Sequence, residues 1–170
     1  MRSASSPSRP IPSGRSGARA GAGPSAVSSP TVAEMPRATR FVLDTSAVLA
    51  LRSDEAGADR VETLLRGAHG GSVDVMLSFM TRMELLYRVT AEEGAEAAAA
   101  AVRLLDASGV TWVSCEPAIL ETAARIKAGG GMSVADAWIA ATAAERGAVL
   151  VHKDPEFARA ADVRQERLPR

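Results

Sequence analysis

Two short apolar runs in this sequence are each followed closely by an aspartate. Asp44 comes directly after residues 41–43, and Asp154 comes shortly after residues 148–151. Apolar runs of this length that alternate with helical patterns are typical of strands in a mostly parallel sheet with both faces covered. In such a sheet the functional crevice lies beyond the carboxyl ends of the strands. We therefore expect both aspartates at the same edge of one sheet.

The rest of the chain also alternates between strand and helix patterns. Strands are predicted at residues 40–43, 73–77, 110–114 and 148–151, with an edge strand at 163–168. Apolar residues at helical spacing predict helices at residues 46–51, 54–66, 81–90, 95–107, 117–127, 133–146 and 155–161. The order of these elements predicts an α/β fold with helices on both faces of a mostly parallel sheet.

The N-terminal part differs in composition from the rest. Arginine, serine, proline, glycine and alanine dominate it, and no hydrophobic periodicity appears before Arg40. Such a segment buries too little apolar surface to offset its ordering entropy. We therefore predict a disordered, low-complexity tail over residues 1–38 and one folded domain over residues 39–170. Translation from Met35 is one alternative, and weak phosphate contacts through the arginines of the tail are another.

Net charge and cysteine content limit the functions and cellular compartments that suit this chain. Four of the 20 basic residues and one of the 20 acidic residues lie in the first 34 positions, so the remainder has a net charge of −3. That balance argues against a tight general nucleic-acid binder. The single Cys115 suits a reducing compartment, and no apolar run approaches the roughly 20 residues that a membrane span needs. These features predict a soluble, cytoplasmic protein with no membrane partner.

Two more acidic residues lie in apolar surroundings. Glu84 is part of a helical stretch at residues 80–87, and Asp136 opens the helix that Ser133 is expected to cap. Burying one charge among apolar neighbours is costly, and burying four acids near each other is prohibitive without cations. Carboxylate oxygens are ligands that hard divalent cations prefer. The four acids therefore predict a divalent-metal site in a metal-dependent hydrolase.

Four short motifs give the sequence a specific likeness. The motifs are Leu-Asp-Thr-Ser-Ala at 43–47, Met-Glu-Leu-Leu-Tyr at 83–87, Ser-Val-Ala-Asp-Ala-Trp-Ile-Ala-Ala-Thr-Ala at 133–143 and Asp-Pro-Glu-Phe at 154–157. In this order they resemble the motifs of the PIN-domain ribonucleases, and most closely those of the VapC-type toxins of bacterial toxin–antitoxin pairs. The resemblance covers about residues 40–169. It implies a three-layer α/β/α sandwich and an endoribonuclease that depends on Mg²⁺ or Mn²⁺.

The resemblance also implies roles for individual residues. Asp44, Glu84 and Asp136 correspond to the three main acids of the family, and Asp154 to a more variable fourth. These acids would act as catalytic residues and metal ligands, while a metal-activated water attacks an RNA phosphodiester. The family implies an RNA substrate, a small cognate antitoxin that blocks the acidic pocket, and frequent homodimers.

Three neighbouring polar residues would support the acids. Thr45 or Ser46 would hold a carboxylate or a metal-bound water in place. Family members commonly have Thr or Ser two residues before the last acid, where this chain has His152. An imidazole could replace the hydroxyl as a hydrogen-bonding group or could bind the metal, but it is bulkier. We favour a structural role for His152.

Each acid also has a purely structural interpretation. Asp44 could cap the following helix, and Asp154 could be a turn residue before a proline. Glu84 could pair with Arg88 on a helix surface, and Asp136 could serve only as a charge in a first helical turn.

Two other functional classes stay open at this point. A non-catalytic PIN-like module that binds RNA or protein would keep the fold, although retention of all four acids argues against it. An aspartyl phosphotransfer enzyme would use Asp44 as nucleophile. Such enzymes usually need a second aspartate two residues later, where this chain has Ser46.

Overall fold

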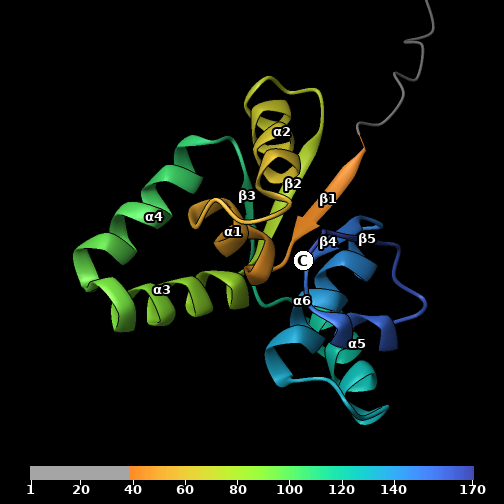
Figure 1. The fold of residues 1–170 in the computed structure, drawn as a ribbon. Helices are drawn as coiled ribbons and strands as arrows, with labels where there is room; N and C mark the ends of the chain where they lie inside the picture. Colours follow the sequence, from red (N-terminus) through yellow and green to blue (C-terminus); the bar gives the residue numbers. More distant parts are fainter. Residues whose placement is uncertain (1–38) are drawn as a thin grey trace, which may run out of the picture. The chain divides into compact units, whose positions relative to one another are not determined.

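The computed structural model of this protein describes residues 39–170, so the tail predicted over residues 1–38 lies outside the described residues. Helices and strands alternate along this part of the chain (Figure 1). The strands are β1 (Arg40–Leu43), β2 (Asp74–Ser78), β3 (Thr111–Val113), β4 (Val149–His152) and β5 (Gln165–Arg167). The helices are α1 (Thr45–Arg52), α2 (Ala58–His69), α3 (Phe79–Glu93), α4 (Ala95–Ala107), α5 (Pro117–Ala128), α6 (Val134–Glu145) and the short 3₁₀ helix η1 (Pro155–Arg159).

The five strands form one parallel sheet in the order β3-β2-β1-β4-β5. Helices α1 to α4 pack on one face, and α5 and α6 pack on the other (Figure 1). The three-layer α/β/α sandwich with a parallel sheet is thus confirmed. Strands β2 and β3 lie on one side of β1, and β4 and β5 lie on the other. The strand order therefore reverses at β1. In an open α/β sheet this point is where ligands bind.

Alternation along the strands separates two hydrophobic cores. Leu43 and Val151 pack against the α1–α4 layer, and Val42 and Leu150 pack against the α5–α6 layer. All four side chains are fully buried, which explains the continuous apolar runs in the sequence. Both cores end at the carboxyl edge of the sheet, where polar side chains begin.

The strand register decides which polar residues meet at this edge. In the pairing of β1 with β4, Leu43 lies opposite Val151, so the next pair is Asp44 and His152. In the pairing of β1 with β2, Val42 lies opposite Met76, so Ser78 is level with Asp44. Successive side chains point to opposite faces of a sheet, and Asp44, Ser78 and His152 therefore share the α5–α6 face.

The start and end of α2 differ from the prediction. Its N-cap is Gly57 with φ 95°, a backbone conformation outside the helical region, so residues 54–57 form a turn instead of the first helical turn. The helix also continues through Gly67 to His69. A Cβ on Gly67 would lie 2.8 Å from a methyl carbon of Val73, so this glycine lets the chain leading into β2 pack closely.

The remaining predicted elements agree with the structure apart from small shifts at their ends. The edge strand expected at residues 163–168 is β5, which pairs in parallel with β4. Within residues 39–170, none of the helices is both long enough and apolar enough to span a membrane.

Candidate functional site

Asp44 lies immediately beyond β1 and is the N-cap of α1. Its backbone N–H donates to the carbonyl of Val151 at 2.9 Å, which ties it to β4. Its Oδ2 accepts hydrogen bonds from the Ser46 backbone N–H at 2.9 Å and from the Ser46 hydroxyl. The structural role as a helix cap is therefore present, yet Asp44 is only 3% exposed, which is unusual for a carboxylate.

The burial of Asp44 changes its acidity. Loss of contact with water raises the pKa of Asp44 from 3.8 to about 6, although the hydrogen bonds from Ser46 oppose this shift. The nearby carboxylate of Asp136 also raises the pKa of Asp44. Among the ion pairs of the described residues, none involves Asp44. Asp44 is thus a buried carboxylate without an ion-pair partner among the described residues, and the charged group that shifts its pKa has the same sign.

Asp136 reaches the site from the other layer of helices. It lies in the first turn of α6 and is half-buried. Its backbone N–H donates to the hydroxyl of Ser133 at 3.0 Å, so the predicted N-cap is confirmed. The N-terminus of a helix carries a partial positive charge that favours an anion there.

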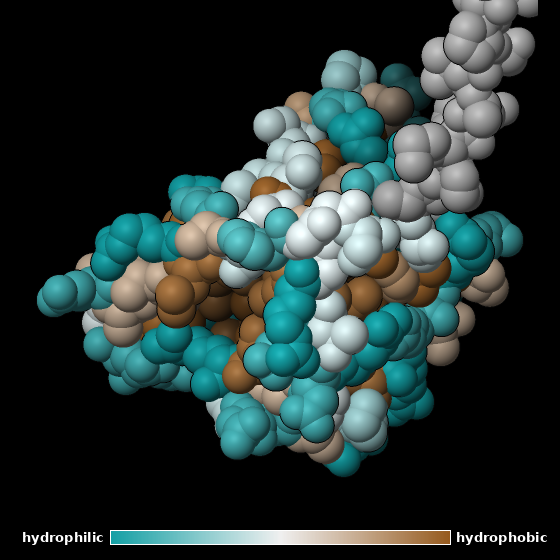
Figure 2. Space-filling model, turned by 90° about the horizontal axis from the view of Figure 1, so that it is seen from above, coloured by the Kyte–Doolittle hydropathy of each residue, from teal (hydrophilic) through white to brown (hydrophobic). Residues whose placement is uncertain are grey.

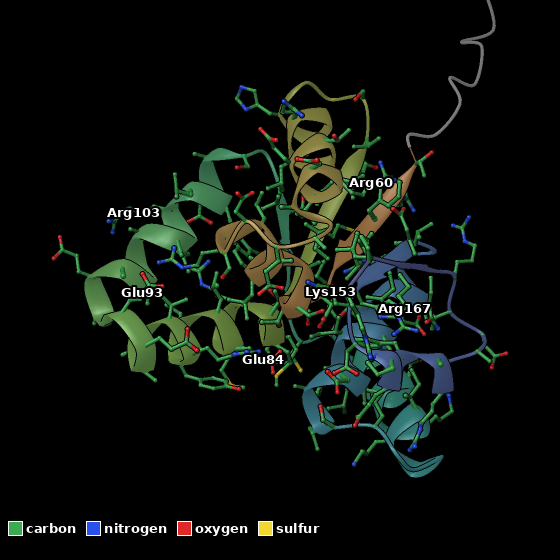
Figure 3. The ribbon with its side chains drawn as sticks, in the orientation of Figure 1. Arg60, Glu84, Glu93, Arg103, Lys153 and Arg167 are labelled. Carbon is green, nitrogen blue, oxygen red and sulfur yellow. The ribbon has the colours of Figure 1, made fainter. Side chains whose placement is uncertain are left out.

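Glu84 is connected to the site through Thr45. It is half-buried near the start of α3, the end of that helix closest to the sheet (Figure 3). The hydroxyl of Thr45, which is 2% exposed, donates to Glu84 Oε2 at 2.5 Å. No ion pair with Arg88 occurs among the described residues, so the surface interpretation of Glu84 has no support.

Asp154 has a structural task of its own. It is half-buried, and its Oδ1 accepts a hydrogen bond from the Glu156 backbone N–H at 2.8 Å, which caps η1. The interpretation as a turn residue before Pro155 is consistent with this contact. A role for Asp154 as a metal ligand stays a prediction.

Ser46 links Asp44 to β4. Its hydroxyl accepts a hydrogen bond from the Lys153 backbone N–H at 2.9 Å while it donates to Asp44. The Lys153 ammonium itself pairs at 2.6 Å with Glu55, which lies in the turn between α1 and α2. The backbone of Lys153 therefore supports the site, whereas its charge is already paired.

His152 is 2% exposed at the end of β4. Its ring packs against Phe157 with the centroids 4.9 Å apart, as a structural role requires. Burial lowers the pKa of His152 and so favours the neutral ring. Its Nδ1 is nevertheless the one buried side-chain nitrogen or oxygen within residues 39–170 that has no hydrogen-bond partner.

The sequence analysis missed Ser78. This residue is completely buried, ends β2 and caps α3 by accepting a hydrogen bond from the Met80 backbone N–H at 3.2 Å. It lies beside Asp44 in the strand register. The available signal was a serine between an apolar run and a helical pattern, the same position that Asp44 occupies after β1.

The structure thus gathers the predicted residues at one edge without forming a closed cage. Within the described part of the chain, no three His, Cys, Asp or Glu side chains stand close enough together to enclose a metal ion. The donor set nonetheless fits a hard divalent cation, because it consists mainly of carboxylate and hydroxyl oxygens around one buried, uncompensated aspartate.

Comparison with known proteins places the chain in a family. The sequence profile of the PIN domain matches residues 41–163, which include all four acids. The chain belongs to the PIN domain family. The predicted resemblance to PIN domains is confirmed, and the individual roles of the acids stay predictions. None of the curated proteins matches this sequence significantly.

Several solved PIN-domain structures have the same fold. The VapBC-1 structure from nontypeable Haemophilus influenzae has a TM-score of 0.61 at 25% identity and covers 76% of this chain and 98% of that chain. VapBC2 from Rickettsia felis, bound to a promoter DNA fragment, has a TM-score of 0.63 at 17% identity over 77% and 100% of the two chains. The Mycobacterium tuberculosis toxin VapC20 has a TM-score of 0.57 at 21% identity over 75% and 98%.

The raised pKa of Asp44 predicts a pH-dependent stability in buffer without divalent cations. Because the pKa is higher in the folded chain, the protonated side chain is favoured there, and this contribution is lost as pH rises from about 4 to about 6. Asp44→Asn cannot ionise and keeps an oxygen that can accept from Ser46. Its free energy of unfolding, relative to the wild type, should therefore rise by about 2 kcal/mol between pH 4 and pH 7, because the unfolded aspartate is already partly ionised at pH 4.

Urea unfolding of both proteins at pH 4, 5, 6 and 7 measures this difference. Glu92→Gln removes one carboxylate from an exposed position of α3 and serves as the control. A difference between Asp44→Asn and the wild type that stays constant over this pH range would contradict the assignment of Asp44 as a buried, uncompensated acid.

Proposed function

We propose that this protein is a metal-dependent endoribonuclease that hydrolyses RNA phosphodiester bonds, and that it is the toxin of a type II toxin–antitoxin pair. The observation that carries the proposal is the buried Asp44 at the strand-order reversal of a PIN domain, with Asp136 as its charged neighbour. Repulsion between these two carboxylates disfavours the folded state when no cation is bound. A divalent cation that binds there makes the same arrangement favourable.

The cation we propose is Mg²⁺ or Mn²⁺. Asp44 and Asp136 would hold it, and Glu84 and Asp154 would complete the set of oxygen donors. When bound, such an ion lowers the pKa of a coordinated water and offsets the negative charge on the departing oxygen. Only hard oxygen ligands are needed for this chemistry, and the acids supply them.

The remaining residues of the site keep the acids in position. Ser46 restrains the carboxylate of Asp44, and Thr45 restrains that of Glu84. Both hydroxyl groups belong to the first turn of α1, so one helix end orients two acids that come from different elements. The partial positive charge at the start of α6 would favour a phosphate or carboxylate beside Asp136.

An RNA substrate is supported by the family and by a structural neighbour. The Mycobacterium tuberculosis neighbour is described as a toxin that cleaves the sarcin–ricin loop. The net charge of −3 beyond the first 34 residues would limit general affinity for RNA. We therefore expect the protein to recognise a defined RNA target through few contacts. We also expect it to act in the cytoplasm.

A small antitoxin is the protein partner that we propose. The Haemophilus influenzae and Rickettsia felis neighbours are VapBC assemblies. Helices α1 to α4 of this chain surround a hollow of about 310 Å³ with mostly apolar walls, and Figure 2 shows an apolar hollow on this side of the molecule. Leu104 at its rim is 68% exposed, and an apolar segment of a partner would cover it. A homodimer of the toxin is a further expectation from the family.

Replacement of Asp136 by asparagine should abolish RNA cleavage and leave the fold intact. Residues that merely orient metal ligands already contribute about 10–100-fold, so loss of a ligand should lower the cleavage rate by more than about 100-fold. Removal of one like charge should leave the cation-free protein as stable as the wild type or more so. Gel analysis of RNA cleavage in Mg²⁺ or Mn²⁺, together with urea unfolding, measures both effects.

Glu92→Gln is the matched control and should cleave RNA like the wild type. Cleavage by Asp136→Asn at the wild-type rate would contradict the proposed site. A wild-type protein that binds RNA but leaves it intact with either cation would instead support a non-catalytic PIN-like binding module.

Divalent cations should stabilise the wild type through Asp44. A ligand that binds only the folded state adds about 2.7 kcal/mol when its concentration is 100 times Kd. The melting temperature of the wild type should therefore rise with added Mg²⁺ or Mn²⁺, and that of Asp44→Ala should rise much less. Differential scanning fluorimetry over a cation titration measures the shifts, again with Glu92→Gln as the control. Equal shifts in the wild type and Asp44→Ala would rule out a site built around Asp44.

A further inference from the structure

We propose that His152 provides a nitrogen ligand to the divalent cation beside Asp44, and that this ligand shifts the preference of the site from Mg²⁺ towards Mn²⁺ and other transition-metal ions. The inference rests on the proposed metal site and adds a ligand that is not a carboxylate. It also revises the structural role that the sequence favoured for His152.

The His152 side chain has an unsatisfied ring nitrogen. His152 is 2% exposed, and its Nδ1 has no hydrogen-bond partner within the described residues. A buried polar atom without a partner is unfavourable, so such an atom in a folded protein calls for an explanation, for example an ion or an ordered water. The packing of the ring against Phe157 explains why the residue is buried, but it does not satisfy Nδ1.

The position of His152 in the sheet places it at the proposed metal site. The pairing of Leu43 with Val151 places His152 next to Asp44 across neighbouring parallel strands, and the two side chains share the α5–α6 face. Asp136 approaches this face from the first turn of α6. The imidazole of His152 therefore lies beside Asp44, the acid on which the proposed metal site depends.

The chemistry of an imidazole donor also suits a divalent cation. A neutral imidazole has one N–H donor and one nitrogen lone pair, and the lone pair is a metal ligand. Carboxylate and water oxygens suit Mg²⁺ and Mn²⁺, whereas imidazole nitrogen suits transition-metal ions such as Fe²⁺, Ni²⁺, Cu²⁺ and Zn²⁺. A mixed set of oxygen donors and one nitrogen should therefore favour Mn²⁺ over Mg²⁺ more strongly than oxygen donors alone.

Pulsed electron paramagnetic resonance of Mn²⁺ bound to the tag-free, full-length protein tests this directly, because a coordinated imidazole nitrogen couples magnetically to the ion. The matched control uses the second histidine of the chain, His69, which is exposed at the end of α2. We expect a histidine nitrogen signal in the wild type and in His69→Gln, and its loss in His152→Gln. Competition titration should show that His152→Gln lowers the preference for Mn²⁺ over Mg²⁺ by about tenfold or more.

A second measurement avoids any change at His152. In His69→Gln grown with ¹⁵N-histidine, His152 is the sole histidine, so a change from the ¹⁴N to the ¹⁵N coupling pattern identifies it as the ligand even if His152→Gln fails to fold. Bound Mn²⁺ without nitrogen coupling would overturn the role of His152 and leave the carboxylate site intact. A wild type that binds neither ion would overturn both this inference and the proposed metal site.

Discussion

Asp44 is a buried carboxylate at the carboxyl end of the central strand β1, and only 3% of the residue is exposed. Hydrogen bonds from Ser46 reduce the cost of this burial, but desolvation and the charge of Asp136 still raise the pKa of Asp44 to about 6. The fold tolerates this arrangement because α1, β4 and α6 all fix the surroundings of one side chain. A cation would convert that unfavourable arrangement into a binding site.

The topology explains why residues so distant in sequence meet here. Strand order reverses at β1, so β2 and β4 flank it and their carboxyl ends lie at the same edge. Three buried polar residues lie side by side at these strand ends: Ser78 ends β2, Asp44 follows β1 and His152 ends β4. Two of them cap helices, and so the same backbone that ends the sheet also orients the polar groups of the site.

Much of the fold could be predicted because local patterns reflect local physics. Buried strands appear as short apolar runs, and Ser133 could be recognised as a cap from its place before an apolar helix. The predicted start of α2 was wrong, because Asp54 and Gly57 both have positive φ and the spacing of apolar residues carries no information about this backbone conformation. The continuation through Gly67 depended on the approach of Val73, a contact that no local pattern contains.

Local patterns along the chain were sufficient to predict the order of strands and helices, the four acids and the family likeness, since each of these depends on neighbouring residues. Which polar residues share a face depends instead on how the elements pack. The hydrogen bond from Thr45 to Glu84, the place of Ser78 beside Asp44 and the unsatisfied nitrogen of His152 all follow from strand register and helix packing. These contacts join elements far apart in the chain, and their geometry is set by the packing of the whole domain.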